Sequence, residues 1–179
     1  MNRAERAGLV VELVDRMRKH GGWSGATHLQ KCLFFLQEAL DVPLGYDFML
    51  YKHGPFSFNL RDELTTFQFA GVLELRANQI PYGPSFVATE RGNEIRSRVP
   101  TAKEYEPQVK FVADHFGRLG VTALERLSTA LLLSKEFPKA SREELAERVH
   151  ELKPHISLER AVQAIDQLKA LEAQAPVAD

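Results

Sequence analysis

Three neighbouring blocks carry most of the fold information: Thr27-His28-Leu29-Gln30-Lys31-Cys32-Leu33-Phe34-Phe35-Leu36, Gly45-Tyr46-Asp47-Phe48 and Tyr51-Lys52-His53-Gly54-Pro55-Phe56-Ser57. The first block lies in a helix predicted at about 26–40 that is apolar on nearly every face, and such a helix is buried. Phe48–Lys52 predicts a short strand, and His53-Gly54-Pro55 predicts a turn that ends it. Ser57 is suited to cap a further helix that runs to about residue 70. This order of elements is typical of a winged helix-turn-helix.

The flanking segments extend the same pattern. A helix is predicted at about 3–20, with an apolar stripe made by Leu9, Val10, Leu13, Val14 and Met17. Val72–Arg76 and Phe86–Thr89 predict paired strands on either side of a loop that contains Pro81, Gly83 and Pro84. We interpret this hairpin as the wing, followed by a helix at about 90–99.

Residues from 101 onward predict helices joined by short loops, which places neighbouring helices antiparallel. The expected fold is therefore α+β and mostly helical. A winged-helix-like module with a small antiparallel hairpin spans residues 1–100 and packs on a C-terminal helical bundle at 101–173, and a flexible tail spans 174–179.

Five helix starts show the capping-box spacing, in which a side-chain oxygen accepts from a backbone N–H and the residue three places later reciprocates. They are Asn2…Glu5, Thr27…Gln30, Thr101…Glu104, Thr122…Glu125 and Ser141…Glu144.

Composition narrows the class of protein. The chain has 179 residues, 44% of them hydrophobic, and a formal net charge of -1. That hydrophobic fraction is sufficient for a packed core. The N-terminus does not read as a signal peptide, and the apolar runs are too short to span a bilayer. We expect a cytoplasmic protein that has no contact with a membrane.

Sequence motifs for catalysis are absent. The six histidines show no metal-ligand spacing, and the one cysteine, Cys32, lies in an apolar helix where a thiol behaves as a small hydrophobe. No phosphate-binding or nucleophile motif occurs. The sequence therefore predicts no catalytic residue, no metal, no cofactor and no enzymatic activity.

The evidence on DNA is divided. The order of elements favours a DNA-binding regulator, but the helix that would enter the major groove presents Arg61 beside Asp62 and Glu63. Residues 1–100 carry a net charge of +1 and residues 101–179 a net charge of -2. Affinity for DNA depends largely on neutralised phosphates, so a transcriptional regulator stays as the alternative function.

Several polar residues stand among strongly apolar ones in the three blocks. Tyr51 offers a large ring with a hydroxyl, which is a composition favoured at protein interfaces. We expect a groove that receives a partner protein, lined by Gln30, Lys31, Tyr51, Lys52, His53 and, from the next helix, Arg61. The alternative is that Lys31 and Tyr51 only join an internal polar network.

Two motif blocks resemble a known family. Leu29-Gln30-Lys31 with Leu33-Phe34-Phe35, and Tyr51-Lys52-His53-Gly54-Pro55 with Leu60 and Leu64, resemble the Panacea domain (SocA-like, antitoxin-associated) over roughly residues 5–100. Uncharacterised bacterial proteins of the YwgA type are similar over more of the chain, including Glu151-Leu152-Lys153-Pro154-His155-Ile156-Ser157.

Members of the Panacea family act as antitoxins or as modules that bind a toxin, and SocA-like members hand the toxin to an ATP-dependent protease. The resemblance implies a binding protein whose partner is a toxin or a protease system. Gln30, Lys31, Tyr51, Gly54 and Pro55 carry the match. Neither the identity of the partner nor the oligomeric state is predicted.

Overall fold

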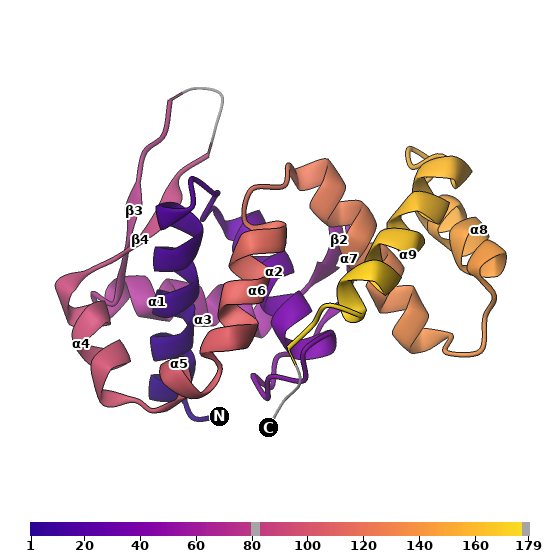
Figure 1. The fold of residues 1–179 in the computed structure, drawn as a ribbon. Helices are drawn as coiled ribbons and strands as arrows, with labels where there is room; N and C mark the ends of the chain where they lie inside the picture. The colour runs from indigo at the N-terminus through magenta and orange to yellow at the C-terminus, as the bar shows by residue number, and fades with distance from the viewer. Residues whose placement is uncertain (80–82, 177–179) are drawn as a thin grey trace.

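Helices dominate the computed structural model, which describes residues 1–79 and 83–176, and two small antiparallel hairpins accompany them (Figure 1). The α+β, mostly helical fold is thus confirmed. The elements in chain order are α1 (Arg3–Lys19), α2 (Ala26–Glu38), β1 (Met49–Tyr51), β2 (Gly54–Phe56), α3 (Phe58–Phe69), β3 (Leu73–Arg76), β4 (Ser85–Ala88), α4 (Glu90–Arg98), α5 (Thr101–Glu104), α6 (Glu106–Phe116), α7 (Val121–Glu136), α8 (Arg142–Leu152) and α9 (Leu158–Glu172).

Helix α2 lies at the centre of the core. Leu29, Leu33, Phe34 and Phe35 are all fully buried, as its all-round apolar sequence predicts. Phe35 stacks on Phe116 of α6 with ring centroids 3.9 Å apart. Neighbours therefore surround α2 on most sides, and its polar residues have to find partners inside the protein.

The predicted capping boxes fall into two groups. Asn2 with Glu5 and Ser141 with Glu144 form the reciprocal pairs at the starts of α1 and α8. The other three predictions are wrong, because Gly25, Pro100 and Gly120 hold the N-cap positions of α2, α5 and α7. In each case the threonine is already a helical residue, so its hydroxyl lies inside the first turn.

The first hairpin corrects the turn predicted at Gly54-Pro55. The turn lies at Lys52 and His53, whereas Gly54 and Pro55 belong to β2, which pairs antiparallel with β1. Proline is tolerated in this two-stranded ribbon, which has no further strand that would need its missing N–H. Gly54 has φ +82°, and a Cβ there would lie 2.9 Å from Oγ1 of Thr129 in α7. The hairpin thus packs closely on α7.

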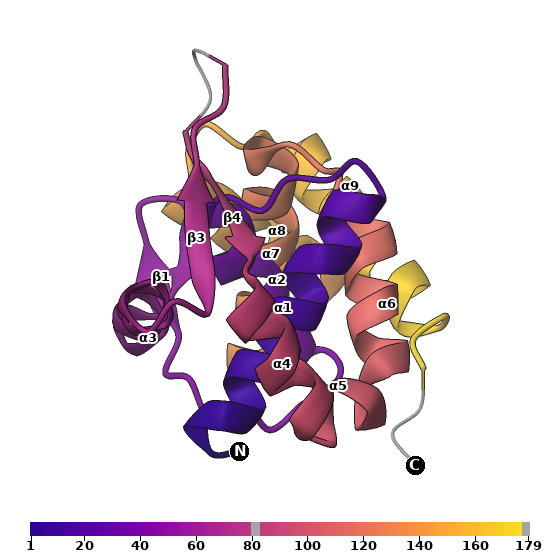
Figure 2. The same ribbon diagram turned by 90° about the vertical axis from the view of Figure 1, so that its left-hand side faces the viewer.

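The second hairpin confirms the predicted wing. Strands β3 and β4 pair from Leu73 opposite Ala88 to Arg76 opposite Ser85. Figure 2 shows the hairpin projecting beyond the helices at the same edge as α3. Pro81, which the sequence placed in the loop, lies outside the described residues. Thr89 caps α4 by accepting from the N–H of Gly92.

The C-terminal helices continue the core without a break. Helices α6 and α7 pack against α2, and α8 and α9 pack against α7 and against each other (Figure 1). The buried apolar residues of both halves form one cluster. In the predicted tail, Ala175 packs against that cluster, and 177–179 lie outside the described residues. Within the described ranges, the helices are all too short or too polar to cross a membrane.

Candidate functional site

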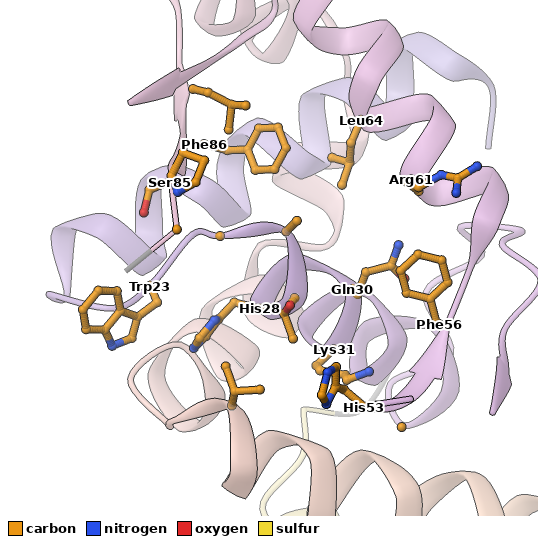
Figure 3. A pocket seen from close by; sticks show the side chains of 18 of the residues that line it. Trp23, His28, Gln30, Lys31, His53, Phe56, Arg61, Leu64, Ser85 and Phe86 are labelled. Atoms are coloured by element: carbon orange, nitrogen blue, oxygen red, sulfur yellow. The ribbon is translucent and has the colours of Figure 1, made fainter. Parts of the chain in front are cut away.

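A groove of about 940 Å³ opens between α2, α3, the two hairpins and the start of α7 (Figure 3). We call it the groove. Its walls are largely apolar and aromatic. All six residues that the sequence assigned to partner binding line it, namely Gln30, Lys31, Tyr51, Lys52, His53 and Arg61.

Gln30 ties α2 to the start of α3. Its Nε2 donates to the carbonyl of Ser57, and its Oε1 accepts from the N–H of Ser57, both at 2.9 Å. Ser57 in turn caps α3 by accepting from the N–H of Leu60. Gln30 is therefore a buried structural residue as well as part of the groove floor.

Lys31 has a similar double position. Its side chain is only 2% exposed, and Nζ donates to the carbonyl of Pro55 in β2 at 2.5 Å. Burial is the main cause that lowers the pKa of Lys31, Glu125 opposes the shift and Lys153 adds to it, and the net result is a pKa of about 8. Lys31 therefore belongs to the internal polar network that the sequence left open as an alternative, and it also lies in the lining of the groove.

The rest of that network lies on α7 and on the turn after α8. Nζ of Lys153 lies 3.3 Å from Oε1 of Glu125 and donates to the carbonyls of Tyr51 at 2.8 Å and Lys52 at 2.5 Å. Glu125 and Lys153 are both buried, and His155 approaches the other Glu125 oxygen at 3.4 Å. The cluster of Lys31, Glu125 and Lys153, which we call the buried charge cluster, anchors the β1–β2 hairpin to the C-terminal helices.

The remaining predicted residues are exposed. Tyr51 is 47% exposed, and its ring contacts those of Phe56 and Phe58. The guanidinium of Arg61 lies 5.1 Å from the centre of the Phe58 ring and pairs with Asp62 at 2.8 Å. These side chains form an aromatic rim along one side of the groove.

Sequence reasoning missed the part of the groove formed by two helix starts. Residues at the starts of α2 and α7 line it, and His28 of α2 bonds through Nε2 with the carbonyl of Leu119, just before α7, at 2.9 Å. Burial lowers the pKa of His28, so the ring is neutral at pH 7. Neither helix has a side-chain cap or an acidic residue in its first turn. The sequence feature that could have indicated this part of the groove is the glycine that precedes each helix, Gly25 before α2 and Gly120 before α7.

The charges in the groove have one sign. Lys31, Lys52, Arg61 and Arg118 line it, and no aspartate or glutamate occurs among its described lining residues. Within the described part of the chain, Lys52 and Arg118 make no ion pair. The groove is therefore electropositive in a chain whose net charge is -1.

Cysteine and histidine are the residue types most often used in catalysis, and here Cys32 and His150 both have structural roles. Cys32 is fully buried, and burial raises the pKa of its thiol to about 12, which leaves it uncharged and unreactive. His150 bonds through Nδ1 with the carbonyl of Ile156 at 2.7 Å. Among the described residues, no three His, Cys, Asp or Glu side chains come together as metal ligands.

Basic residues of α3, the wing and α4, the elements that a DNA-binding regulator would use, are compensated by nearby acids. Arg61 pairs with Asp62, and Arg76 of the wing pairs with Glu74 at 2.8 Å. Arg96 of α4 pairs with Asp15 of α1 at 2.7 Å. This face carries little net positive charge for phosphates.

Comparison with known proteins adds no assignment, because the sequence matches no protein-family model and no curated protein. The resemblance to the Panacea domain rests on the short blocks around Gln30, Lys31 and Gly54-Pro55.

Proposed function

We propose that this chain is a non-enzymatic protein-binding module that receives a segment of a partner protein in the groove. One observation carries the proposal. Six residues that stood out in the sequence as polar side chains among apolar ones, and that come from α2, the β1–β2 turn region and α3, line one groove.

The composition of the groove suits a protein partner. Aromatic side chains and arginine are enriched at the centres of protein interfaces, and here Trp23, Tyr51, Phe56 and Arg61 surround an apolar hollow. Its floor is held by hydrogen bonds from buried side chains, including those of Gln30 and Lys31. A floor that is already ordered loses little conformational entropy on binding, which favours affinity.

The specific form of the proposal is an antitoxin or a proteolytic adaptor that acts in the cytoplasm. The resemblance to the Panacea domain supports it, since Gln30, Lys31, Tyr51, Gly54 and Pro55 carry that resemblance and all but Pro55 line the groove. The partner is then a toxin, which the chain neutralises directly or presents to a protease.

A winged-helix DNA-binding regulator is the second candidate. The order α1, α2, β1, β2, α3 and the β3–β4 wing favours it. The ion pairs of Arg61 with Asp62 and Arg76 with Glu74 count against it, because they leave little uncompensated charge for phosphates.

Site-specific photo-crosslinking in the source cell tests the proposal. The photo-reactive residue benzoylphenylalanine replaces either His53, an exposed residue of the groove, or Lys103, an exposed residue of α5 outside it. We expect position 53 to capture a defined protein and position 103 to capture none. Capture of nucleic acid at position 53, or identical products at both positions, would contradict the proposal.

A further inference from the structure

The electrostatic character of the groove narrows the chemistry of its occupant. Lys52 and Arg118 stand on different walls, without ion pairs in the described part of the chain, and both are exposed. Attraction between such charges and a ligand is strengthened by the apolar walls around them. A cationic segment would be repelled here, and an uncharged one would leave these charges unused.

The buried charge cluster contributes a second, independent observation. It holds two ammonium groups, Lys31 and Lys153, against the one carboxylate of Glu125, and Glu125 pairs with Lys153. Lys31 has no ion pair of its own among the described residues, although it is 2% exposed. The single carboxylate therefore leaves one buried positive charge uncompensated. Such a charge costs free energy, and an anion bound in the groove would relieve that cost.

The starts of α2 and α7 add partial positive charge at the other side of the groove. The first amides of a helix have no partner within the helix, and the macrodipole makes that end positive. Gly25 and Gly120 supply no side chain that could accept from those amides, and both residues line the groove. His28 holds the two helix starts side by side through its bond with Leu119.

Resting on the proposed function, we propose that the segment the groove receives is acidic. It is an extended peptide whose carboxylates face Lys31, Lys52, Arg118 and the two helix starts, with apolar side chains between them that pack on Phe56 and Phe86. A single-stranded nucleic acid would also be anionic. The observations favour a peptide, because the cations stand apart on apolar walls instead of forming a continuous track for a phosphate backbone.

A displayed library of random nonapeptides tests the composition of the occupant. The full chain is panned against the library in parallel with the double variant Lys52→Glu/Arg118→Glu. We expect the peptides that bind only the unaltered chain to be enriched in aspartate and glutamate. Peptides that depend on the groove but are uncharged or basic would overturn this inference and leave the proposed function standing. The absence of any groove-dependent peptide would overturn both.

Titration then locates and quantifies the interaction. A labelled acidic peptide from the panning is compared with its counterpart in which every acid is replaced by the corresponding amide, and with a single-stranded oligonucleotide of thymidine. Trp23 is the one tryptophan of the chain and lines the groove, so its emission reports occupancy. We expect the amide peptide to bind the unaltered chain roughly tenfold more weakly than the acidic peptide does. The acidic peptide should bind each single variant, Lys52→Glu or Arg118→Glu, roughly tenfold more weakly than it binds the unaltered chain.

The matched control is Lys103→Glu, which makes the same change in net charge away from the groove. Its affinity for the peptide should stay within about twofold of the unaltered chain. If all three substitutions weaken peptide binding equally, the weakening comes from the net charge of the chain and not from the groove, which would overturn the inference. Tighter binding of the oligonucleotide than of any peptide would overturn the proposed function as well, and would favour a nucleic-acid-binding protein.

Discussion

The groove and the outer face of α3 with its wing both carry basic side chains, and they differ in how those charges are compensated. On the outer face, Arg61, which also forms part of the groove rim, and Arg76 each pair with an acid one or two residues away in sequence. In the groove, Lys52 and Arg118 have no such neighbour, and Lys31 shares a single carboxylate with Lys153. The lesson is that the pairing of charges, more than their number, indicates where an anionic ligand can bind.

Removal of the shared carboxylate should have the largest effect on stability. Glu125→Gln leaves Lys31 and Lys153 buried without a negative charge nearby. We expect a loss of about 3–5 kcal/mol in the free energy of unfolding, measured by urea denaturation. Asp62→Asn, which breaks the exposed pair with Arg61, is the control and should cost less than about 1 kcal/mol. Equal losses in the two variants would erase the contrast between the two regions.

The buried ammonium of Lys31 should show itself in the pH dependence of stability. Its pKa lies near 8 in the folded protein and near 10.5 ordinarily. Between these values the unfolded chain binds more protons than the folded one, so stability rises with pH across that window. Relative to Lys31→Met, which lacks the charge, we expect the unaltered chain to gain about 3 kcal/mol from pH 8 to 10.5.

Denaturation of both proteins at several pH values checks this prediction, and only the difference between them is used, because tyrosines and other lysines titrate in the same range. Lys31→Met should fold, since an apolar side chain of similar volume replaces a buried charge. A difference that does not change with pH would mean that Lys31 keeps an ordinary pKa and has more access to solvent than the structure shows.

The fit of the β1–β2 hairpin against α7 can be tested at glycine. Gly54 and Gly45 both have positive φ, +82° and +76°, but only Gly54 has a neighbour, Thr129, within the reach of a new Cβ. Both alanine variants carry backbone strain, and Gly54→Ala adds a steric clash. We expect Gly54→Ala to cost about 1–3 kcal/mol more than Gly45→Ala in thermal or urea unfolding. If the two cost the same, the hairpin is free to move away from α7.

The smallest effect on stability, and the sharpest test of the outer face, comes from removing its acids. Asp62→Asn and Glu74→Gln should each change the free energy of unfolding by less than about 1 kcal/mol, as exposed pairs do. The double variant should bind duplex DNA at low salt, because Arg61 and Arg76 are then free for phosphates. The unaltered chain should show no specific binding at physiological salt in a footprinting assay, and a specific footprint would favour the regulator.

Local patterns predicted most of the elements. The apolar patterns of α1 and α2, the cap at Ser57 and the β3–β4 hairpin all depend on residues close together in sequence. Two kinds of prediction, the capping boxes at three threonines and the turn at Gly54-Pro55, were wrong for an equally local reason. The capping-box spacing at Thr27, Thr101 and Thr122 was met by residues that already lie inside a helix, and Gly54-Pro55 was interpreted as a turn although its pairing with β1 makes it a strand.

Local sequence patterns predicted only part of the candidate site. Gln30 and Lys31 were recognisable as polar residues on an apolar helix, and the rim residues Tyr51 and Arg61 by their composition. Glu125 and Lys153 were not, because each looks like an ordinary charged residue within its own helix or turn. Their role comes from a contact with the β1–β2 hairpin, more than 70 residues away from Glu125 in sequence.

The sequence by itself thus determined the helices, the wing and the polar positions on α2, because periodicity, capping and turn formation depend on residues near one another in the chain. Tertiary packing alone decided that the start of α7 closes one side of the groove, that Glu125 serves Lys31 and Lys153 together, and that the starts of α2 and α7 lie side by side. Those outcomes depend on burial and on charges brought together from distant segments, and both the desolvation of Lys31 and the one-signed lining of the groove exist only once the chain has folded.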